Sequence, residues 1–459
     1  MLIKYSNQPV PRSIATPPYS LCYTEYLKNN PKSTKSFGLW QDLCFMPQQT
    51  TTIPTIDFEK IRKDFPVLHQ KVNGHPLVYL DNGASGQMPV QVADRIDLYH
   101  RYEHSNVHRG IHTLSQNATD AYELTRKNVQ EFINASSHEE IVYTTGATDS
   151  INLVANTFGA ANLREGDEVI LSEMEHHANI VPWQMVAERT GAVIKVIPVT
   201  DSGDLDMDAY KDLLSNKTKI VAVIHVSNAL GTVNPVKEIT DLAHEAGAAV
   251  LIDGAQSVPH QKVDVQEIGC DFFVFSAHKM CGPTGFGILY GKKELLDAMP
   301  PYRGGGDMID KVSFEETTYN VAPYRFEAGT PPISAGIGLG AAIDYLNSIG
   351  MENIETREQE LVNYAVKRLS EIEGLRMIGE SEHRASVCSF VFDHIHASDL
   401  GTILDKRGIA VRTGHHCAQP ILRRFNVPAT TRASISFYNT EEDIDRLIDG
   451  IHYAKTFFE

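Results

Sequence analysis

The chain has 459 residues, of which 42% are hydrophobic and 22% are charged, and it carries a formal net charge of −17. This length and composition are typical of a globular protein with two or more domains. So much negative charge repels phosphate backbones, which argues against nucleic acid as a partner, and no apolar run approaches the roughly 18–20 residues that cross a bilayer.

The first 45 residues differ from the rest, because basic residues outnumber acidic ones there and Pro, Ser, Thr and Asn are frequent. No apolar stretch precedes a small-residue cleavage site, so a secretory signal is not expected. We expect residues 1–54 to be a disordered extension, or the result of a start site upstream of a natural one at Met46. A transit peptide is the alternative, since acidic residues are scarce, although arginine is scarce too.

The six cysteines lie far apart in the sequence and form no CxxC pair. In a chain of this length, that pattern indicates neither a disulfide framework nor a zinc ribbon. Reduced thiols and a cytoplasmic location are therefore expected. Cys281 is expected only to pack in the core.

From about residue 140, apolar runs alternate with helical patterns. Near-continuous Val, Ile and Phe runs predict strands at residues 139–146, 167–173, 192–199, 219–227, 249–255 and 271–279. Helical spacing lies between them at residues 150–162, 179–191 and 236–247. Strands buried on both faces, with helices between them, indicate βαβ units and an α/β fold around a parallel sheet.

After about residue 326 the pattern changes to a smaller α+β domain. An amphipathic helix is predicted at 356–374, a strand at 385–393 and a short helix at 396–408. We therefore predict a large domain at residues 73–325 and a small C-terminal domain at residues 326–459. The segment at residues 55–72 is expected to pack on the small domain.

Polar side chains gather where the predicted strands end. They are Thr148, His176, Asn228, Asp253, His278 and Lys279. Ligands of parallel sheets bind beyond the carboxyl ends of the strands. The sequence therefore predicts a binding site at this edge.

Lys279 follows a buried run directly and precedes a Gly-rich turn, in "FSAHKMCGPTGFG". A lone lysine there would most simply reach solvent, but it could also form a Schiff base with an aldehyde cofactor. Asp253 ends the preceding apolar run and could pair with the pyridine nitrogen of pyridoxal phosphate. Gln256 could bind the ring hydroxyl.

The remaining strand-end residues suit the rest of such a cofactor. Thr148 opens a helix after Gly146, and N–H groups at a helix start bind phosphate. Ser276 and His278 could add donors, and His176 could stack on the ring and move protons. Taken alone, each of these residues is better explained as a helix cap or a loop residue than as a cofactor ligand. Their common location at the strand ends favours a cofactor site.

These motifs together resemble the SufS-type (group II) cysteine desulfurases, which are fold-type I pyridoxal-phosphate enzymes. The resemblance runs from about residue 56 to the C-terminus. It rests on "YLDNGAS", "NVHRGIHTLS", "EHHANIVPW", "HVSNALGT", "LIDGAQSVPH", "SAHKMCGPTGFG", "FEAGTPP" and "VRTGHHCAQP". It implies a large domain with a mostly parallel seven-stranded sheet flanked by helices, and a smaller α+β domain. The sequence departs from the pattern at Ala147 and Asp149 and in the glycines of "DNGASGQ".

The resemblance also implies a role for individual residues. Lys279 would hold the cofactor aldehyde, Cys417 would take up sulfur as a persulfide, and His176 would stack on the ring. The cofactor-binding positions would be Thr148, His176, Asp253, Gln256, Ser276, His278, Lys279 and Thr330, the last supplied by the second subunit of a homodimer. The substrate-binding positions would be Asn228, Arg412 and Arg432, with Arg432 on the carboxylate.

The implied reaction converts L-cysteine to L-alanine, and the sulfur passes to a SufE- or SufU-like acceptor protein for iron–sulfur cluster assembly. A selenocysteine lyase is the nearest alternative, since selenium would need less help from Cys417. An aminotransferase would leave "HHCA" without a purpose. A catalytically silent scaffold would have no need for Lys279, Asp253, His176, Arg432 and Cys417 together.

Cys417 itself has three interpretations. A zinc site with His415 and His416 is sterically poor, because adjacent side chains seldom reach one ion and no second cluster supplies ligands. A buried structural thiol is common, but the polar neighbours indicate a loop. A nucleophile fits best, because Arg412 and the histidines favour the thiolate.

Overall fold

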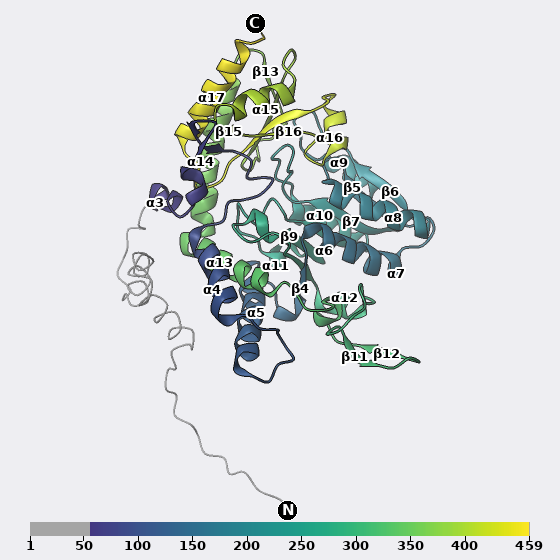
Figure 1. The fold of residues 1–459 in the computed structure, drawn as a ribbon. Helices are drawn as coiled ribbons and strands as arrows, with labels where there is room; N and C mark the ends of the chain where they lie inside the picture. Colours follow the sequence, from purple (N-terminus) through teal and green to yellow (C-terminus); the bar gives the residue numbers. More distant parts are fainter. Residues whose placement is uncertain (1–55, 459) are drawn as a thin grey trace, which may run out of the picture. The chain divides into compact units, whose positions relative to one another are not determined.

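The computed structural model describes residues 56–458 (Figure 1). The expectations for residues 1–54, including the one for Met46, lie outside the described residues. Among residues 56–458, no helix combines the length and the apolar character that crossing a membrane requires.

A seven-stranded sheet forms the centre of the molecule, in the order β4-β10-β9-β8-β7-β5-β6. Six strands run parallel, and β10 alone is antiparallel to its neighbours. The predicted α/β fold with a mostly parallel sheet is confirmed. The strands are β4 (Ile141–Thr144), β5 (Glu168–Ser172), β6 (Val193–Ile197), β7 (Thr218–Ile224), β8 (Ala249–Asp253), β9 (Phe272–Ser276) and β10 (Gly287–Gly291).

Each face of this sheet is covered by helices, as Figure 1 shows, and successive strand residues point to opposite cores. In β9, Phe273 and Phe275 belong to one core, and Phe272 and Val274 belong to the other. The first core includes side chains of α5 (Thr113–Phe132), α10 (Val236–Glu245), α11 (Val265–Ile268) and α13 (Ile333–Ile349). The second includes side chains of α6 (Ala147–Val154), α8 (Val181–Thr190) and α12 (Lys293–Ala298). Burial on both faces explains the near-continuous apolar runs of the sequence.

The C-terminal part of the chain builds a second, antiparallel sheet in the order β13-β14-β17-β16. Its strands are β13 (Leu375–Ile378), β14 (Val387–Phe392), β16 (Arg412–Gly414) and β17 (Thr430–Ser434). Its helices are α14 (Met351–Ser370), α15 (Ala397–Asp405), α16 (Gln419–Arg424) and α17 (Glu441–Lys455). Leu361 and Leu369 of α14 share a third core with Ile444 and Leu447 of α17. The predicted amphipathic helix therefore buries the stripe that the sequence indicated.

Shorter elements complete the fold. They are α3 (Phe58–Arg62), β1 (Lys71–Val72), β2 (His75–Pro76), β3 (Val78–Tyr79), α4 (Val90–Leu98), α7 (Ala160–Asn162), α9 (Met207–Leu213), β11 (Ile309–Val312), β12 (Thr317–Tyr319) and β15 (Ile409–Ala410). The segment around α3 contacts the C-terminal part, since Arg62 Nη1 donates to Asp443 Oδ2 at 2.9 Å and to the Tyr438 carbonyl at 2.7 Å.

Helix α13 follows the predicted domain boundary at residue 326, yet it packs on α4 and α5. Glycines of α13 allow its close approach to α5. A Cβ at Gly336 would lie 2.4 Å from the Tyr122 ring, and one at Gly340 would lie 2.5 Å from Thr125 Oγ1. The boundaries of the two domains stay a prediction.

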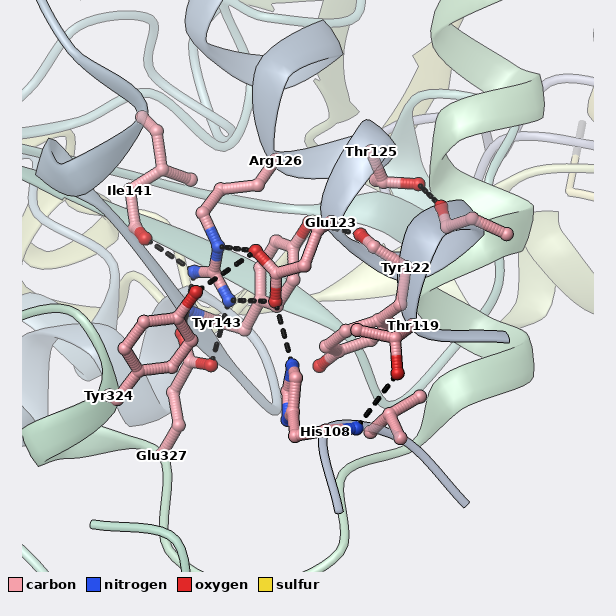
Figure 2. A network of polar contacts seen from close by, with 12 residues as sticks. His108, Thr119, Tyr122, Glu123, Thr125, Arg126, Ile141, Tyr143, Tyr324 and Glu327 are labelled. Carbon is pink, nitrogen blue, oxygen red and sulfur yellow. Dashed lines mark hydrogen bonds and ion pairs between the residues drawn. The ribbon is translucent and has the colours of Figure 1, made fainter. Parts of the chain in front are cut away.

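A buried ion-pair network joins α5 to the segment that follows β12 (Figure 2). Arg126 is fully buried, and it pairs with Glu123 at 2.9 Å and with Glu327 at 2.7 Å. Its guanidinium also donates to the Ile141 carbonyl at 2.6 Å and lies 4.0 Å from the centre of the Tyr143 ring. Glu327 in turn accepts from the Tyr143 backbone N–H at 2.7 Å. The network therefore fixes the Glu327 segment against β4.

Replacing Arg126 with Met should leave the buried Glu327 carboxylate without its cation. We expect the free energy of unfolding to fall by about 3–5 kcal/mol, measured by urea denaturation of the whole chain. Lys237→Met is the matched control, because its ion pair with Asp241 is exposed on both sides and should contribute about 0.5 kcal/mol or less. Equal effects of the two substitutions would contradict the role given to the network.

Candidate active site

Lys279 and Asp253 meet where two neighbouring strands end. Asp253 is the last residue of β8, and Lys279 closes a short helical turn, Ala277–Lys279, directly after β9. Burial lowers the pKa of Lys279 to about 8, and the Asp253 carboxylate is the largest influence that opposes this shift. Burial also raises the pKa of Asp253, and Lys279 opposes that rise. The pair therefore places an amine that ionises near neutral pH beside a buried acid.

A cavity of about 490 Å³ lies next to this pair, at the beginning of α6. Thr148, Ser276 and His278, predicted to bind phosphate, all line it. Ser276 Oγ accepts the Ala147 backbone N–H at 2.8 Å, which joins β9 to the first turn of α6. Because the N–H groups of a first helical turn carry partial positive charge, the cavity suits an anion.

Two of the predicted site residues, Gln256 and Asn228, each keep a buried side-chain oxygen that has no hydrogen-bond partner in the described part of the chain. Gln256 Nε2 donates to the Gly83 carbonyl at 2.6 Å, but its buried Oε1 has no partner. Asn228 Nδ2 donates to the His416 carbonyl at 2.6 Å, and its Oδ1 is likewise buried without a partner. Buried polar atoms are normally satisfied, so these two oxygens are free to accept hydrogen bonds from a ligand at the predicted site.

The two predicted substrate-binding arginines differ in burial. Arg432, in β17, is 2% exposed, whereas the Arg412 side chain is 43% exposed. Arg432 Nη2 lies 3.1 Å from Asp81 Oδ1, and its Nη1 donates to the Asn228 carbonyl at 2.8 Å. Burial lowers the pKa of Arg432, and Asp81 opposes that shift. Asp81 therefore orients the buried cation, a role that the sequence analysis missed although "YLDNGAS" contains it.

Cys417 is exposed, whereas Cys270, Cys281 and Cys388 are buried. The neighbouring His416 is buried and shares a hydrogen bond of 2.7 Å with Thr430 Oγ1. The exposed position contradicts the interpretation of Cys417 as a buried structural thiol, and burial of Cys281 agrees with its packing role. Among residues 56–458, no group of three or more His, Cys, Asp or Glu side chains is arranged to hold a metal ion.

His176 follows β5 and lies close enough to Lys279 for the lysine to influence its pKa. Its Nδ1 accepts the Ala178 backbone N–H at 3.1 Å, so the ring proton of the neutral form sits on Nε2. Burial, with Lys279 as the next cause, lowers the pKa of His176 to about 4. A neutral His176 with an Nε2 proton therefore faces the site near neutral pH.

Thr330 is the predicted site residue that the resemblance assigns to the second subunit of a homodimer. It is exposed, and it is not among the described residues that line the cavity. The sequence analysis also missed His177, whose backbone N–H donates to the Cys417 carbonyl at 2.7 Å. Its only signal in the sequence was the doubled histidine of "EHHAN".

Residues 78–447 match the model of the family described as aminotransferase class-V. A probable cysteine desulfurase of Halalkalibacterium halodurans is 54% identical over 399 residues, which are 87% of this chain and 98% of the relative. The chain belongs to the cysteine desulfurases of the aminotransferase class-V family. A cysteine desulfurase of Synechococcus elongatus is 50% identical over 443 residues, which are 94% of this chain and 71% of the relative. The crystal structure of the Escherichia coli cysteine desulfurase CsdA superposes with a TM-score of 0.83 at 38% identity, over 88% of this chain and all of that one.

Pyridoxal 5′-phosphate is the cofactor of this family, as the resemblance implied, and the residues present fit it. The cavity at the start of α6 suits the phosphate, and Asp253 offers a buried carboxylate for the pyridine nitrogen. The unpaired Gln256 Oε1 suits the ring hydroxyl. Lys279 is the amine that can hold the aldehyde.

The amine of Lys279 should lose its proton near pH 8 in the cofactor-free protein, because burial disfavours its charged form. Asp253→Asn removes the carboxylate that raises this pKa, so the midpoint should move to lower pH. The pH dependence of reductive methylation at Lys279, read by mass spectrometry, measures the titration midpoint in the wild type and in Asp253→Asn. Labelling of the exposed Lys237 should not change with the substitution. An unchanged or higher Lys279 midpoint in the variant would show that the two side chains do not interact.

The approach of β10 to the start of α6 should be essential for cofactor binding. A Cβ at Gly287 would lie 2.4 Å from the Gly146 Cα, so Gly287→Ala must displace the turn that leads into the cavity. We expect the affinity for pyridoxal phosphate to fall at least tenfold, measured by absorbance titration of the cofactor-free protein. Gly304→Ala is the control, because a Cβ there meets nothing within 4 Å. Unchanged affinity in Gly287→Ala would exclude this cavity as the phosphate site.

Proposed function

We propose that this chain is a pyridoxal-phosphate-dependent cysteine desulfurase in which Cys417 receives the sulfur of L-cysteine as a persulfide. The observation that carries the proposal is that the exposed Cys417 thiol lies near both the Lys279 amine and the buried Arg432 guanidinium. The Cys417 thiol lies close enough to Lys279 and Arg432 to influence the pKa of both. A nucleophile, a base and a carboxylate partner therefore share one site.

Arg432 is proposed to bind the substrate carboxylate. A buried guanidinium forms paired, charge-assisted hydrogen bonds with a carboxylate. Its Nε is buried without a partner in the described part of the chain, so it keeps a donor for a ligand. Asp81 and the Asn228 carbonyl hold the other two guanidinium nitrogens, which fixes the direction of the free donor.

Lys279 is proposed to take the proton from the substrate Cα. With a pKa of about 8, a useful fraction of its amine is neutral at physiological pH. When bound, pyridoxal phosphate supplies an electron sink for the charge that this proton transfer leaves behind. Asp253 supports that chemistry as a buried carboxylate at the end of β8.

Cys417 is proposed to attack the substrate sulfur as a thiolate, because the thiolate is the nucleophilic form of cysteine. A sulfur–sulfur bond forms on Cys417 while the bond between the substrate sulfur and Cβ breaks. The electron pair of the broken bond stays on carbon, and protons delivered to carbon complete L-alanine. The His176 Nε2 proton faces the site and is placed to take part in this delivery. No outside oxidant or reductant is needed, because one sulfur atom moves from cysteine to Cys417.

The finer features of the proposal concern partners and location. Exposure of Cys417 supports transfer of the persulfide sulfur to a SufE- or SufU-like acceptor protein for iron–sulfur cluster assembly. Thr330 lies outside the cavity of its own chain, which supports a homodimer in which it reaches the partner's phosphate site. A cytoplasmic location is proposed from the dispersed cysteines, since it would keep their thiols reduced.

Purified protein with added pyridoxal phosphate, L-cysteine and a reductant tests the proposal. We expect equal amounts of sulfide and alanine from the wild type, and a loss of at least a hundredfold in Cys417→Ala with the cofactor absorbance retained. Full activity of Cys417→Ala on L-cysteine would exclude the nucleophile role. Activity on L-selenocysteine alone would identify the alternative, a selenocysteine lyase.

A further inference from the structure

The main chain of the loop at residues 415–419 is held from two sides by hydrogen bonds to Asn228 and His177. Asn228 Nδ2, beyond the end of β7, donates to the His416 carbonyl at 2.6 Å. His177, in the turn after β5, donates its backbone N–H to the Cys417 carbonyl at 2.7 Å. The His177 side chain also accepts, since the Gln419 backbone N–H donates to its Nε2 at 3.1 Å. His177 therefore binds the loop at two points, at the nucleophile itself and two residues after it.

The loop needs such support because its backbone is unfavourable. His416 and Cys417 both adopt the left-handed conformation, with φ of 52° and 56°. Residues with a Cβ rarely adopt it, and two in succession persist only where neighbouring structure holds them. Loss of a support should let the loop relax and move the Cys417 thiol away from its present direction.

The side-chain contact of His177 requires a neutral ring. Nε2 can accept the Gln419 N–H only when it carries no proton, so the proton of the neutral ring sits on Nδ1. Burial and the nearby His415 lower the pKa of His177, which favours the neutral form. The ring of His176 lies 6.3 Å away, centre to centre, on the side of the same turn that faces Lys279.

The turn that carries both histidines is itself rigid. Glu175 is fully buried, and it accepts from Asn179 Nδ2 at 2.6 Å and from the Ile224 N–H of β7 at 2.9 Å. Asn179 Oδ1 in turn accepts from Trp183 Nε1 at 3.0 Å. The turn is therefore fixed to β7 and to α8, so it can hold a loop that arrives from the other end of the sequence.

We propose that His177 is a positioning residue for the nucleophile, and that its Nε2 holds the loop at residues 415–419 so that the Cys417 thiolate points at the substrate sulfur. The inference rests on the proposed function and adds to it. His176 faces Lys279, and the next residue fixes the direction of attack.

His177→Phe and His177→Gln, made in the full chain with bound pyridoxal phosphate, separate this role from a space-filling one. Phenylalanine keeps a ring but has no acceptor, whereas glutamine offers an amide oxygen at a similar distance from the backbone. We expect kcat for alanine formation to fall at least tenfold in His177→Phe, with KM for L-cysteine changed less than threefold because Arg432 still binds the carboxylate. His177→Gln should retain kcat within about threefold. The cofactor absorbance and its change on adding L-cysteine should be the same in all three proteins.

Hydrogen exchange of the peptide that contains Gln419 gives the structural readout. It should be faster in His177→Phe than in the wild type, and His177→Gln should restore the protection. Wild-type kcat in His177→Phe, or an equal loss in both variants, would overturn the positioning role. A wild type that forms no alanine would instead overturn the proposed function, so the two failures are distinguishable.

Discussion

Burial of the Lys279 amine beside the Asp253 carboxylate is the interaction on which the rest of the site depends. Strands β8 and β9 are buried throughout almost their whole length, so charged groups can appear only where they end. An isolated charge removed from water there would be unfavourable, and the opposite charge of the other group offsets part of that desolvation penalty. The same burial lowers the pKa of Lys279 to about 8, which turns an ordinary strand-end lysine into a base suited to neutral pH.

The site joins two parts of the chain with different contributions. The seven-stranded sheet supplies the cofactor side, through the cavity at α6 and the ends of β8 and β9. The four-stranded sheet supplies Arg432 in β17, and the loop after β16 supplies Cys417. Asn228 contacts both of these elements, since its side chain binds the His416 carbonyl and its own carbonyl accepts from Arg432. The proposed carboxylate partner and the proposed nucleophile are therefore both held by one strand-end loop.

Sequence reasoning worked where one local pattern decided the structure. The runs at 249–255 and 271–279 contain strands β8 and β9, in which all positions but Ala249 are buried, and polar residues follow where these strands end. Strand β10 was missed, because glycines at both ends of Gly287–Gly291 shorten its apolar run. The helix predicted at 150–162 is interrupted by a π-helical turn, Ala155–Gly159. Arg126, Asp81 and His177 could not be assigned, because their partners lie far away in the sequence and only the tertiary fold brings them together.

Mass spectrometry of the whole protein after a single addition of L-cysteine tests the central claim most directly. The protein, with bound pyridoxal phosphate and without reductant, would be digested and its cysteine peptides compared before and after the addition. The account predicts that one sulfur atom is added to the peptide containing Cys417 as alanine appears. Alanine formation with no added sulfur on Cys417, or with sulfur on Cys270, Cys281 or Cys388, would contradict it.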